Sequence, residues 1–380
     1  MADHGVLWSA IGLYESNSIH SYQHPSLKGK IMKAIVYIKY GSPDVLELKE
    51  VAKPGPKDNE VLVKVHAASV NSADLHSLRA DPFLIRLASG LLKPKNTILG
   101  ADIAGQVEAV GRNVKQLKPG DEVFGDISGC GWGGFAEYVR ASENALVLKP
   151  ANLTFEEAAA VPMAAVTALQ GLRDKGQIQP GQKVLIYGAS GGVGTFAVQI
   201  ARSFGAEITA VCSTKNLDLA RSIGADHVID YTREDFTKNG HRYDLILAAN
   251  GYRSISDYKR ALNPKGIYVM SGGSGPQMSE AMLQGPWISM TGSQKMGNLL
   301  ARPNNTDLIF MKELLEAGKV KPVIDRRYPL SKVAEAMRYL EEGHAKGKVV
   351  ITLQNSGNFQ NAIPVAVKNN RMAADASITK

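Results

Sequence analysis

The chain has 380 residues and a formal net charge of +8, from 44 basic and 36 acidic side chains. This length exceeds what one hydrophobic core usually organises, so we expect two domains. No apolar run reaches the roughly 20 residues of a membrane-spanning helix, and basic and acidic residues alternate along the chain, which argues against a nucleic-acid-binding protein.

Only two cysteines, Cys130 and Cys212, occur in the sequence. Two cysteines cannot form a disulfide framework, and no closely spaced cysteine pair is present for a structural zinc site. The early apolar stretch "GVLWSAIGLY" lacks the basic flank of a signal peptide. We therefore expect a cytoplasmic protein with reduced thiols.

The first strand is predicted at "MKAIVYIKYG" from Met32, and residues 1–31 are interpreted as an N-terminal extension. Short β runs separated by turn residues continue to residue 152, and they include "VLVKVHAASV", "ADIAGQVEAVG", "DEVFGD", "GFAEYVRA" and "ALVLKP". This pattern predicts a compact β-rich domain.

Residues 153–298 alternate between strands and helices, as in "QKVLIYG", "TFAVQIARSFG", "EITAVCS" and "LDLARSIG". Such alternation is typical of a doubly wound parallel sheet. Residues 299–353 then give a helix, an extended piece, another helix and a last strand, "GKVVITL", which we expect to complete the first domain. Residues 354–380, rich in Asn, Ala and Lys, are predicted to be a flexible tail.

Four glycines follow a predicted strand in "YGASGGVGTFAVQ", namely Gly188, Gly191, Gly192 and Gly194. A strand, a glycine turn and a helix place free backbone N–H groups and a positive dipole end where a phosphate can bind. Glycine also permits the close approach of a pyrophosphate. A glycine-rich turn alone also occurs for packing reasons, but within a βαβ unit it predicts a dinucleotide site.

The strand after this turn, "EITAV", indicates which dinucleotide binds. An Asp or Glu at its end would bind a free ribose 2′-hydroxyl. This chain instead has Cys212, Ser213, Thr214 and Lys215, whose hydroxyls and cation suit a 2′-phosphate. We therefore expect NADPH rather than NADH. A second role is compatible with the first, since Ser213 and Thr214 also suit the cap of the following helix.

Motifs spread over residues 32–353 resemble the medium-chain dehydrogenase/reductases, and among them the zinc-free NADPH:quinone oxidoreductases. They are "YGSPDVLEL", "VNSADLHSL", "LGADIAGQVEAVG", "KPGDEVFG", "AAAVPMAAVTALQGL", "GASGGVG", "IGADHVIDY" and "GHAKGKVVI". The resemblance implies an α/β protein with a GroES-like β-barrel catalytic domain, residues 32–152 and 299–353, and a Rossmann domain, residues 153–298. It places the nicotinamide in the cleft between them and implies a homodimer.

The segments "AVCS", "ADHVIDY" and "EEGHAKGKVVI" are especially similar to the reticulon-interacting mitochondrial reductases of that family. Beside the glycine turn and Lys215, this similarity implies NADPH contacts from Thr167, Ser190, Gly192, Val193, Ser213, Tyr231, Asn250, Lys346, Gly347 and Lys348. Other interpretations stay open, because Tyr231 also suits the end of a strand and the two lysines also suit a solvated helix exit.

The zinc ligands of the related alcohol dehydrogenases are missing from this sequence. Where those enzymes carry a Cys before the first helix the chain has Asn71, and where they carry Gly-His-Glu it has Gly-Ala-Asp at residues 100–102. A catalytic zinc site needs thiolate, imidazole or carboxylate ligands that converge on the metal. We therefore expect no metal, and we interpret His66 as a strand residue and His241 as a surface loop residue.

A substrate reduced without a metal is expected to be conjugated, because quinones and α,β-unsaturated carbonyls spread the incoming electron pair over their π-system. Asn71 and His76 fall where relatives place an Asn and a Tyr. Asn71 is predicted to orient substrate or nicotinamide, and His76 to donate a proton near neutral pH. Alternatively, His76 packs on a helix and water protonates the product.

The sequence thus predicts an oxidoreductase that transfers hydride from NADPH to a quinone or an α,β-unsaturated carbonyl. The alternative is an NADPH-binding protein with little turnover, such as a redox sensor, a crystallin-like protein or an RNA binder, because relatives with such roles share the fold. Saturable turnover distinguishes the two hypotheses.

Overall fold

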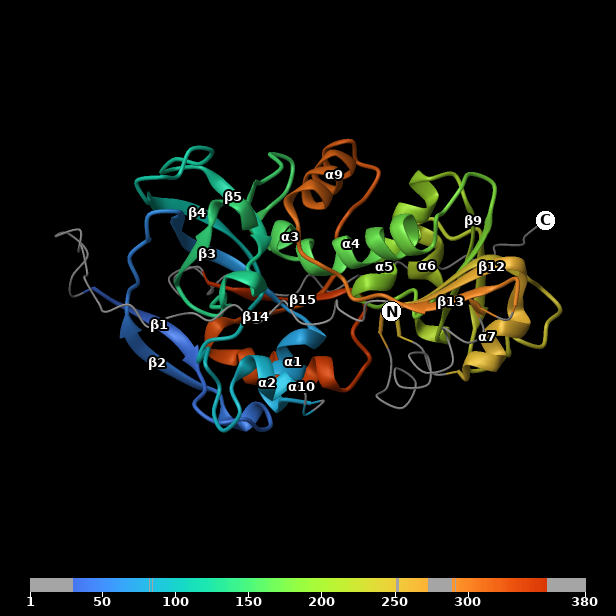
Figure 1. The fold of residues 1–380 in the computed structure, drawn as a ribbon, viewed down its shortest axis with the longest axis horizontal. Coiled ribbons are helices and arrows are strands. Elements are labelled where there is room, and N and C mark those ends of the chain that lie inside the picture. Colours follow the sequence, from blue (N-terminus) through green and yellow to red (C-terminus); the bar gives the residue numbers. More distant parts are fainter. Residues whose placement is uncertain are drawn as a thin grey trace, which may run out of the picture.

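The computed structural model describes residues 30–81, 83, 85–250, 253–272, 289–290 and 292–353. Two lobes, each centred on a β-sheet, lie on either side of a group of helices (Figure 1). The expected C-terminal tail and almost all of the expected N-terminal extension lie outside the described residues. None of the described helices has the length and apolar character needed to cross a bilayer.

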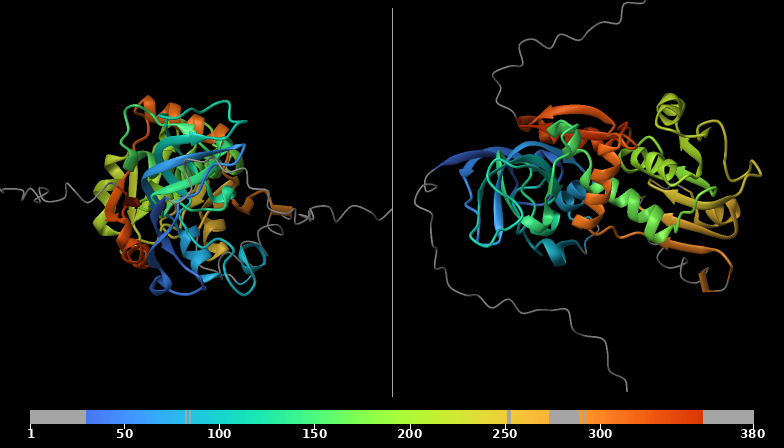
Figure 2. Two further views of the ribbon diagram at one scale, coloured as in Figure 1. Left: turned by 90° about the vertical axis from the view of Figure 1, so that its left-hand side faces the viewer. Right: turned by 90° about the horizontal axis from the view of Figure 1, so that it is seen from above.

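The sheet of the first lobe runs in the order β14-β15-β3-β4-β5-β7, with β6 paired to β3 as well. Its strands are β3 (Glu60–Val70), β4 (Asp102–Val110), β5 (Glu122–Asp126), β6 (Tyr138–Ser142), β7 (Val147–Leu148), β14 (Ile324–Pro329) and β15 (Lys348–Thr352). One end of β3 pairs with β6 and the other end with β15. The last described strand, β15, therefore returns to the first sheet, and Figure 1 draws it beside β14 in that lobe; Figure 2 gives two further views of the same arrangement.

A separate hairpin, β1 (Ile31–Val36) and β2 (Glu47–Ala52), adds to this lobe. The N–H of Ile35 donates to the carbonyl oxygen of Phe135 at 2.9 Å, which ties the hairpin to the segment before β6. The surrounding helices are α1 (Ser72–Arg79), α2 (Ile85–Ser89) and α10 (Val333–Glu341).

The sheet of the second lobe has the order β10-β9-β8-β11-β12-β13, and every neighbouring pair is parallel. Its strands are β8 (Lys183–Tyr187), β9 (Glu207–Cys212), β10 (His227–Asp230), β11 (Tyr243–Ala248), β12 (Leu262–Met270) and β13 (Lys295–Asn298). This order is that of a doubly wound dinucleotide-binding sheet, whose direction of winding reverses between β8 and β11. The helices of this lobe are α5 (Gly192–Ser203), α6 (Leu217–Ser222) and α7 (Ile255–Ala261). The predicted fold class is confirmed.

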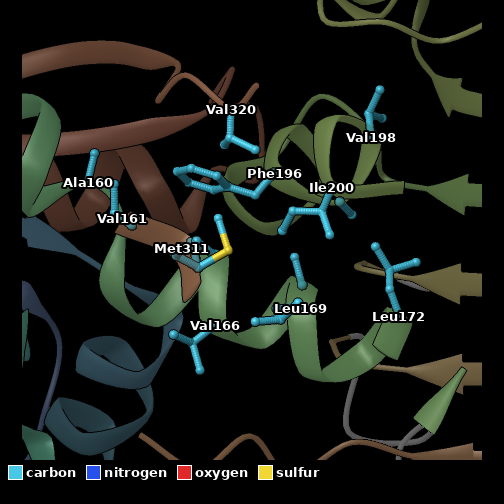
Figure 3. Close-up of a cluster of buried hydrophobic side chains, with 14 of the residues drawn as sticks. Ala160, Val161, Val166, Leu169, Leu172, Phe196, Val198, Ile200, Met311 and Val320 are labelled. Carbon is cyan, nitrogen blue, oxygen red and sulfur yellow. The ribbon is translucent and has the colours of Figure 1, made fainter. Parts of the chain in front are cut away.

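Three helices lie between the two sheets (Figure 1), namely α3 (Phe155–Ala159), α4 (Pro162–Leu169) and α9 (Asn305–Glu316). One hydrophobic cluster joins Ala104 and Phe124 of the first sheet to Val184 of the second through these helices. In Figure 3, Val166 of α4, Phe196 of α5 and Met311 of α9 belong to this cluster. Burial of a Phe or Met side chain contributes about 1.5–3 kcal/mol, so a packed core rather than a linker joins the two lobes.

Candidate active site

The glycine turn that joins β8 to α5 is closely packed. Gly188 has a φ of +79°, in the left-handed region that favours glycine. The N–H groups of Gly188 and Ala189 both donate to the carbonyl oxygen of Val211 at 3.1 Å. A Cβ built on Gly194 would lie only 2.1 Å from the carbonyl oxygen of Gly188. The turn therefore needs glycine at both positions for its own packing.

Gly191 has a different environment, because its missing side chain leaves open space. Its φ of −83° suits any residue, and a Cβ there would approach only the carbonyl oxygen of Gly188, at 3.5 Å. Gly191 is also the N-cap of the 12-residue helix α5, and no side chain accepts the first N–H groups of that helix. Gly192 and Val193 form the first turn. Open space in front of free N–H groups fits the pyrophosphate of a dinucleotide.

A buried amide connects this turn to the next strand. The Nδ2 of Asn216 donates to the Oγ atoms of Ser190, at 3.0 Å, and Ser213, at 3.2 Å. Its Oδ1 is buried and has no hydrogen-bond partner among the described residues. Asn216 therefore holds two predicted cofactor-binding serines together and keeps one acceptor for a further donor. The sequence reasoning missed this residue.

The end of β9 carries no carboxylate, as the prediction of NADPH requires. Thr214 donates its hydroxyl to Asp230 at the end of β10. Hydrogen bonds from Thr214 and then Thr232 hold the pKa of the Asp230 carboxyl below its usual range. Lys215 is exposed, and no ion pair within the described part of the chain engages it. Ser213 and Lys215, rather than Thr214, are thus the groups left for a 2′-phosphate.

Two further predicted contacts lie at the carboxyl ends of neighbouring strands. Tyr231 follows β10; the residue is 45% exposed, and its ring centroid lies 6.3 Å from that of Tyr187. Asn250 follows β11, and its Cβ would lie 3.2 Å from a Cβ built on Gly188. The carboxyl ends of strands at a switch point are where doubly wound sheets bind dinucleotides. Both residues therefore border the same site as the glycine turn.

The segment before β15 joins the two lobes at the glycine turn. The N–H of Gly347 donates to the carbonyl oxygen of Ser190 at 2.8 Å, and Gly347 also forms a β-bridge with Gly191. Gly347 has a φ of +93°, and a Cβ there would lie 2.2 Å from the carbonyl oxygen of Val323. Lys346 is exposed. The structure therefore places Gly347 directly against the predicted cofactor loop.

Lys348, the first residue of β15, reaches a buried polar cluster. Its side chain is 4% exposed, and its ammonium donates to the Oδ1 of Asn71 and lies 3.6 Å from the Oδ2 of Asp102. The Nδ2 of Asn71 and the Oγ of Ser69 each donate to that Asp102 oxygen at 3.0 Å. The N–H of Met163 donates to the other oxygen at 3.0 Å. We call Ser69, Asn71, Asp102 and Lys348 the Lys348 cluster.

The Lys348 cluster shows that this lysine is not a solvated helix exit. Burial lowers the pKa of Lys348 and raises the pKa of Asp102, and each charge opposes the shift of the other. The pair is neutral in sum whether the shared proton sits on nitrogen or on oxygen, and a neutral hydrogen-bonded pair tolerates burial. The long stem of Lys348 also passes under α5, since a Cβ on Gly192 would lie 3.1 Å from its Cδ.

Asn71 and Asp102, which stand where zinc alcohol dehydrogenases carry the Cys and the Glu named above, thus both contact the ammonium group of Lys348. Among the described residues no group of three or more His, Cys, Asp and Glu side chains is arranged to hold a metal ion. His66 lies in β3 and stacks on Phe155, with ring centroids 4.3 Å apart. His241 is exposed before β11.

Asp74 and His76 of α1 have contrasting environments. The Oδ2 of Asp74 accepts the N–H of Asn71 at 2.8 Å and its Oδ1 accepts the N–H of Gly100 at 2.9 Å. Burial raises the pKa of Asp74 to about 7. His76 is exposed, and its Nδ1 lies 2.9 Å from the carbonyl oxygen of Asp81. The structure therefore brings Asn71 into the Lys348 cluster and leaves His76 outside it, so a proton-donor role for His76 stays a prediction.

A cavity of about 400 Å³ is connected to the Lys348 cluster through Met163, which lines the cavity and whose N–H donates to Asp102. Its wall includes Ala73 of α1, Asp126 of β5, and Met163 and Thr167 of α4. This volume is within the range of small-molecule sites. Thr167 was predicted to contact the cofactor, whereas the sequence reasoning missed Asp126 and Met163. They stand in the segments "GDEVFGD" and "AAAVPMAAVTALQGL", whose composition gave no signal of a site.

Comparisons with known proteins agree with this architecture. Residues 57–151 match the alcohol dehydrogenase GroES-like domain, and residues 223–351 match the zinc-binding dehydrogenase family. The 2-methylene-furan-3-one reductase of Solanum lycopersicum is 40% identical over 333 residues, which are 84% of this chain and 79% of that protein. The chain belongs to the medium-chain dehydrogenase/reductase family.

Two other proteins show how far the likeness extends within the medium-chain dehydrogenase/reductases. The chloroplastic NADPH-dependent alkenal/one oxidoreductase of Arabidopsis thaliana is 36% identical over 85% of this chain and 80% of its own length. The solved structure of the quinone oxidoreductase from Coxiella burnetii has 30% identity and a TM-score of 0.76, over 86% of this chain and 100% of that one. The predicted family is confirmed.

Proposed function

We propose that this medium-chain dehydrogenase/reductase transfers hydride from NADPH to a quinone or an α,β-unsaturated carbonyl. The observation that carries the proposal is the contact between the two lobes at Gly347 and Lys348. It sets the glycine turn beside the Lys348 cluster, and that cluster is bonded to the wall of a cavity through Met163, whose N–H donates to Asp102. The names of the similar tomato, Arabidopsis and Coxiella proteins point to the same classes of substrate.

The residues at the former zinc positions favour a conjugated acceptor. Asn71 and Asp102 both contact the ammonium group of Lys348, and neither is among the residues that line the cavity. Reduction of a simple ketone builds charge on one oxygen, whereas a conjugated system spreads it, so positioning and hydrogen bonds suffice. Bound NADPH supplies the hydride. The chain itself holds the phosphates at α5 and Lys215, and it orients Asn71 through Lys348.

The first test is NADPH oxidation followed by absorbance, under anaerobic conditions and with a metal chelator, with a small quinone or a short-chain enal as acceptor. We expect saturable oxidation of NADPH with at least one acceptor and much slower oxidation of NADH. If NADPH binds tightly but neither acceptor consumes it, the reductase hypothesis is wrong for these substrates. The binding-protein alternative, a redox sensor or crystallin-like protein, then takes its place.

Two finer predictions remain to be tested. We propose a homodimer, because the resemblance to the quinone oxidoreductases implies one, and light scattering coupled to size exclusion should give the mass of two chains. A monomeric mass would contradict it. The cytoplasmic location also stays a prediction, and the similar Arabidopsis protein is named as chloroplastic.

A further inference from the structure

Asp126 ends β5 at the wall of the cavity. Its side chain is buried, with the residue 8% exposed, and its Oδ1 accepts the N–H of Ser128 at 2.9 Å. The register of the sheet pairs it with Asp102, the first residue of β4. A carboxyl group therefore borders the space for a substrate and stands beside a second, fully buried carboxyl.

The charges around Asp126 come from three elements. Asp102 faces Asp126 from β4, and Lys348 of β15 is the next charged group. Cys130 follows β5, and burial raises the pKa of its thiol and keeps the thiol neutral. The ammonium of Lys348 is already matched by Asp102. No Lys, Arg or His among the described residues forms an ion pair with Asp126. Burial, and then the charge of Asp102, raise the pKa of Asp126 to about 6.

We propose that Asp126 is the proton donor of the reduction, a catalytic role that rests on the proposed function. When hydride adds to the β-carbon of an enone, the electron pair of the C=C bond passes to the carbonyl oxygen and leaves an enolate. The α-carbon of the enolate takes one proton from the carboxyl group of Asp126, and the C–H bond of the saturated carbonyl compound forms as the O–H bond of the acid breaks. The resulting carboxylate regains a proton from water after the product leaves. The sum is NADPH, enone and one proton to NADP⁺ and the saturated carbonyl compound.

Asp126 combines a raised pKa with a place in the cavity wall, and the neighbouring acids lack one or both of these properties. Asp74 is fully buried, and backbone N–H groups bind both of its oxygens. Asp102 has its oxygens occupied by Ser69, Asn71 and Met163. His76 is exposed on α1 and is not among the residues that line the cavity. Asp126 is the acid that combines burial, a place in the wall and no counter-charge.

The test compares wild type with Asp126→Asn, which keeps an oxygen for the Ser128 N–H but has no acidic proton. We expect kcat with an enal to fall at least tenfold at about pH 6, while the NADPH dissociation constant stays unchanged. In wild type kcat should decline as the pH rises above about 6, because the acid loses its proton, and in Asp126→Asn it should be flat. Asp126→Glu, which has an acidic proton, should keep most of the wild-type rate and pH dependence that Asp126→Asn loses.

Asp58→Asn is the matched control, because Asp58 forms only an exposed ion pair with Arg112. It should leave both the rate and the pH profile unchanged. Equal kcat values and equal pH profiles for wild type and Asp126→Asn would overturn the proposal. If Asp126→Asn does not fold, the profiles of wild type and Asp126→Glu decide, and the lack of a group titrating near pH 6 overturns it. A wild type that does not oxidise NADPH with enones refutes the proposed function instead.

Discussion

Two glycines of the same turn are predicted to respond in opposite ways to one added methyl group. In Gly191→Ala the new Cβ enters the open space in front of α5 and approaches only one carbonyl oxygen, at 3.5 Å. In Gly194→Ala the new Cβ would lie 2.1 Å from the carbonyl oxygen of Gly188, far inside the 3.4 Å at which ordinary contact begins. Gly191→Ala therefore tests whether the pyrophosphate of NADPH binds at this position, and Gly194→Ala tests the packing of the turn.

The magnitudes follow from these contacts. Gly194→Ala overpacks a rigid turn, which costs about 1–3 kcal/mol of unfolding free energy and lowers Tm by about 1–2 °C per kcal/mol in a chain of this size. Gly191→Ala leaves stability within about 0.5 kcal/mol, because a new side chain away from packed groups changes little. Its methyl group occupies the expected path of the pyrophosphate. We expect NADPH affinity to fall at least tenfold, about 1.4 kcal/mol.

The assay pairs thermal unfolding without nucleotide with calorimetric titration of NADPH, for wild type and both variants. We expect Gly191→Ala to unfold at the wild-type temperature and to bind NADPH weakly. Gly194→Ala should unfold earlier. If Gly191→Ala binds NADPH as tightly as wild type, the pyrophosphate does not lie over this residue. An unchanged Tm for Gly194→Ala would contradict the packing argument.

Two other substitutions test Lys215, at the expected position of the 2′-phosphate, and Lys348, in the buried Lys348 cluster. Lys215→Ala should weaken NADPH binding about 10- to 150-fold and leave NADH binding unchanged, since a charge-assisted contact to the 2′-phosphate is worth about 1.5–3 kcal/mol. Equal losses for both nucleotides in a titration would refute this role. Lys348→Met leaves Asp102 buried without a counter-charge and should lower the unfolding free energy by about 3–5 kcal/mol. The loss of unfolding free energy should be greater at about pH 8 than at about pH 5. Burial raises the pKa of Asp102, and its protonated form, which prevails at the lower pH, needs no counter-charge. Denaturant unfolding that shows the same loss at both pH values would contradict this prediction.

Most strands were predictable because they bury one or both faces. In β3 nearly every side chain is buried, and the run "VLVKVHAASV" shows this directly. β2 was not predicted, since its residues Glu47–Ala52 are almost all exposed and carry no hydrophobic alternation. β13 was missed as well, because Lys295–Asn298 has four residues without an apolar run, and its place at the edge of the sheet follows from pairing with β12.

The boundary between the two predicted domains, at residue 153, does not separate two independent cores in the structure. The sequence reasoning assigned residues from 153 onward to the dinucleotide-binding domain, because strand and helix begin to alternate there. In the structure α3 and α4 belong to a core that includes side chains of both sheets. Apolar periodicity indicates that a helix is buried but not which sheet covers it. The position of Thr167 and Met163 in the cavity wall depends on this shared core.

The glycine turn was predictable because its whole geometry is local, from β8 through Gly188 to α5. The Lys348 cluster was not, since it joins residues 277 positions apart, Asn71 and Lys348, through strand pairing that no local pattern encodes. The pairing of Asp102 with Asp126 lies between these cases. An Asp opens one strand and another Asp closes the next, and antiparallel strands place such residues opposite each other. Two carboxyls that meet across antiparallel strands therefore indicate a perturbed acid only once the pairing of those strands is known.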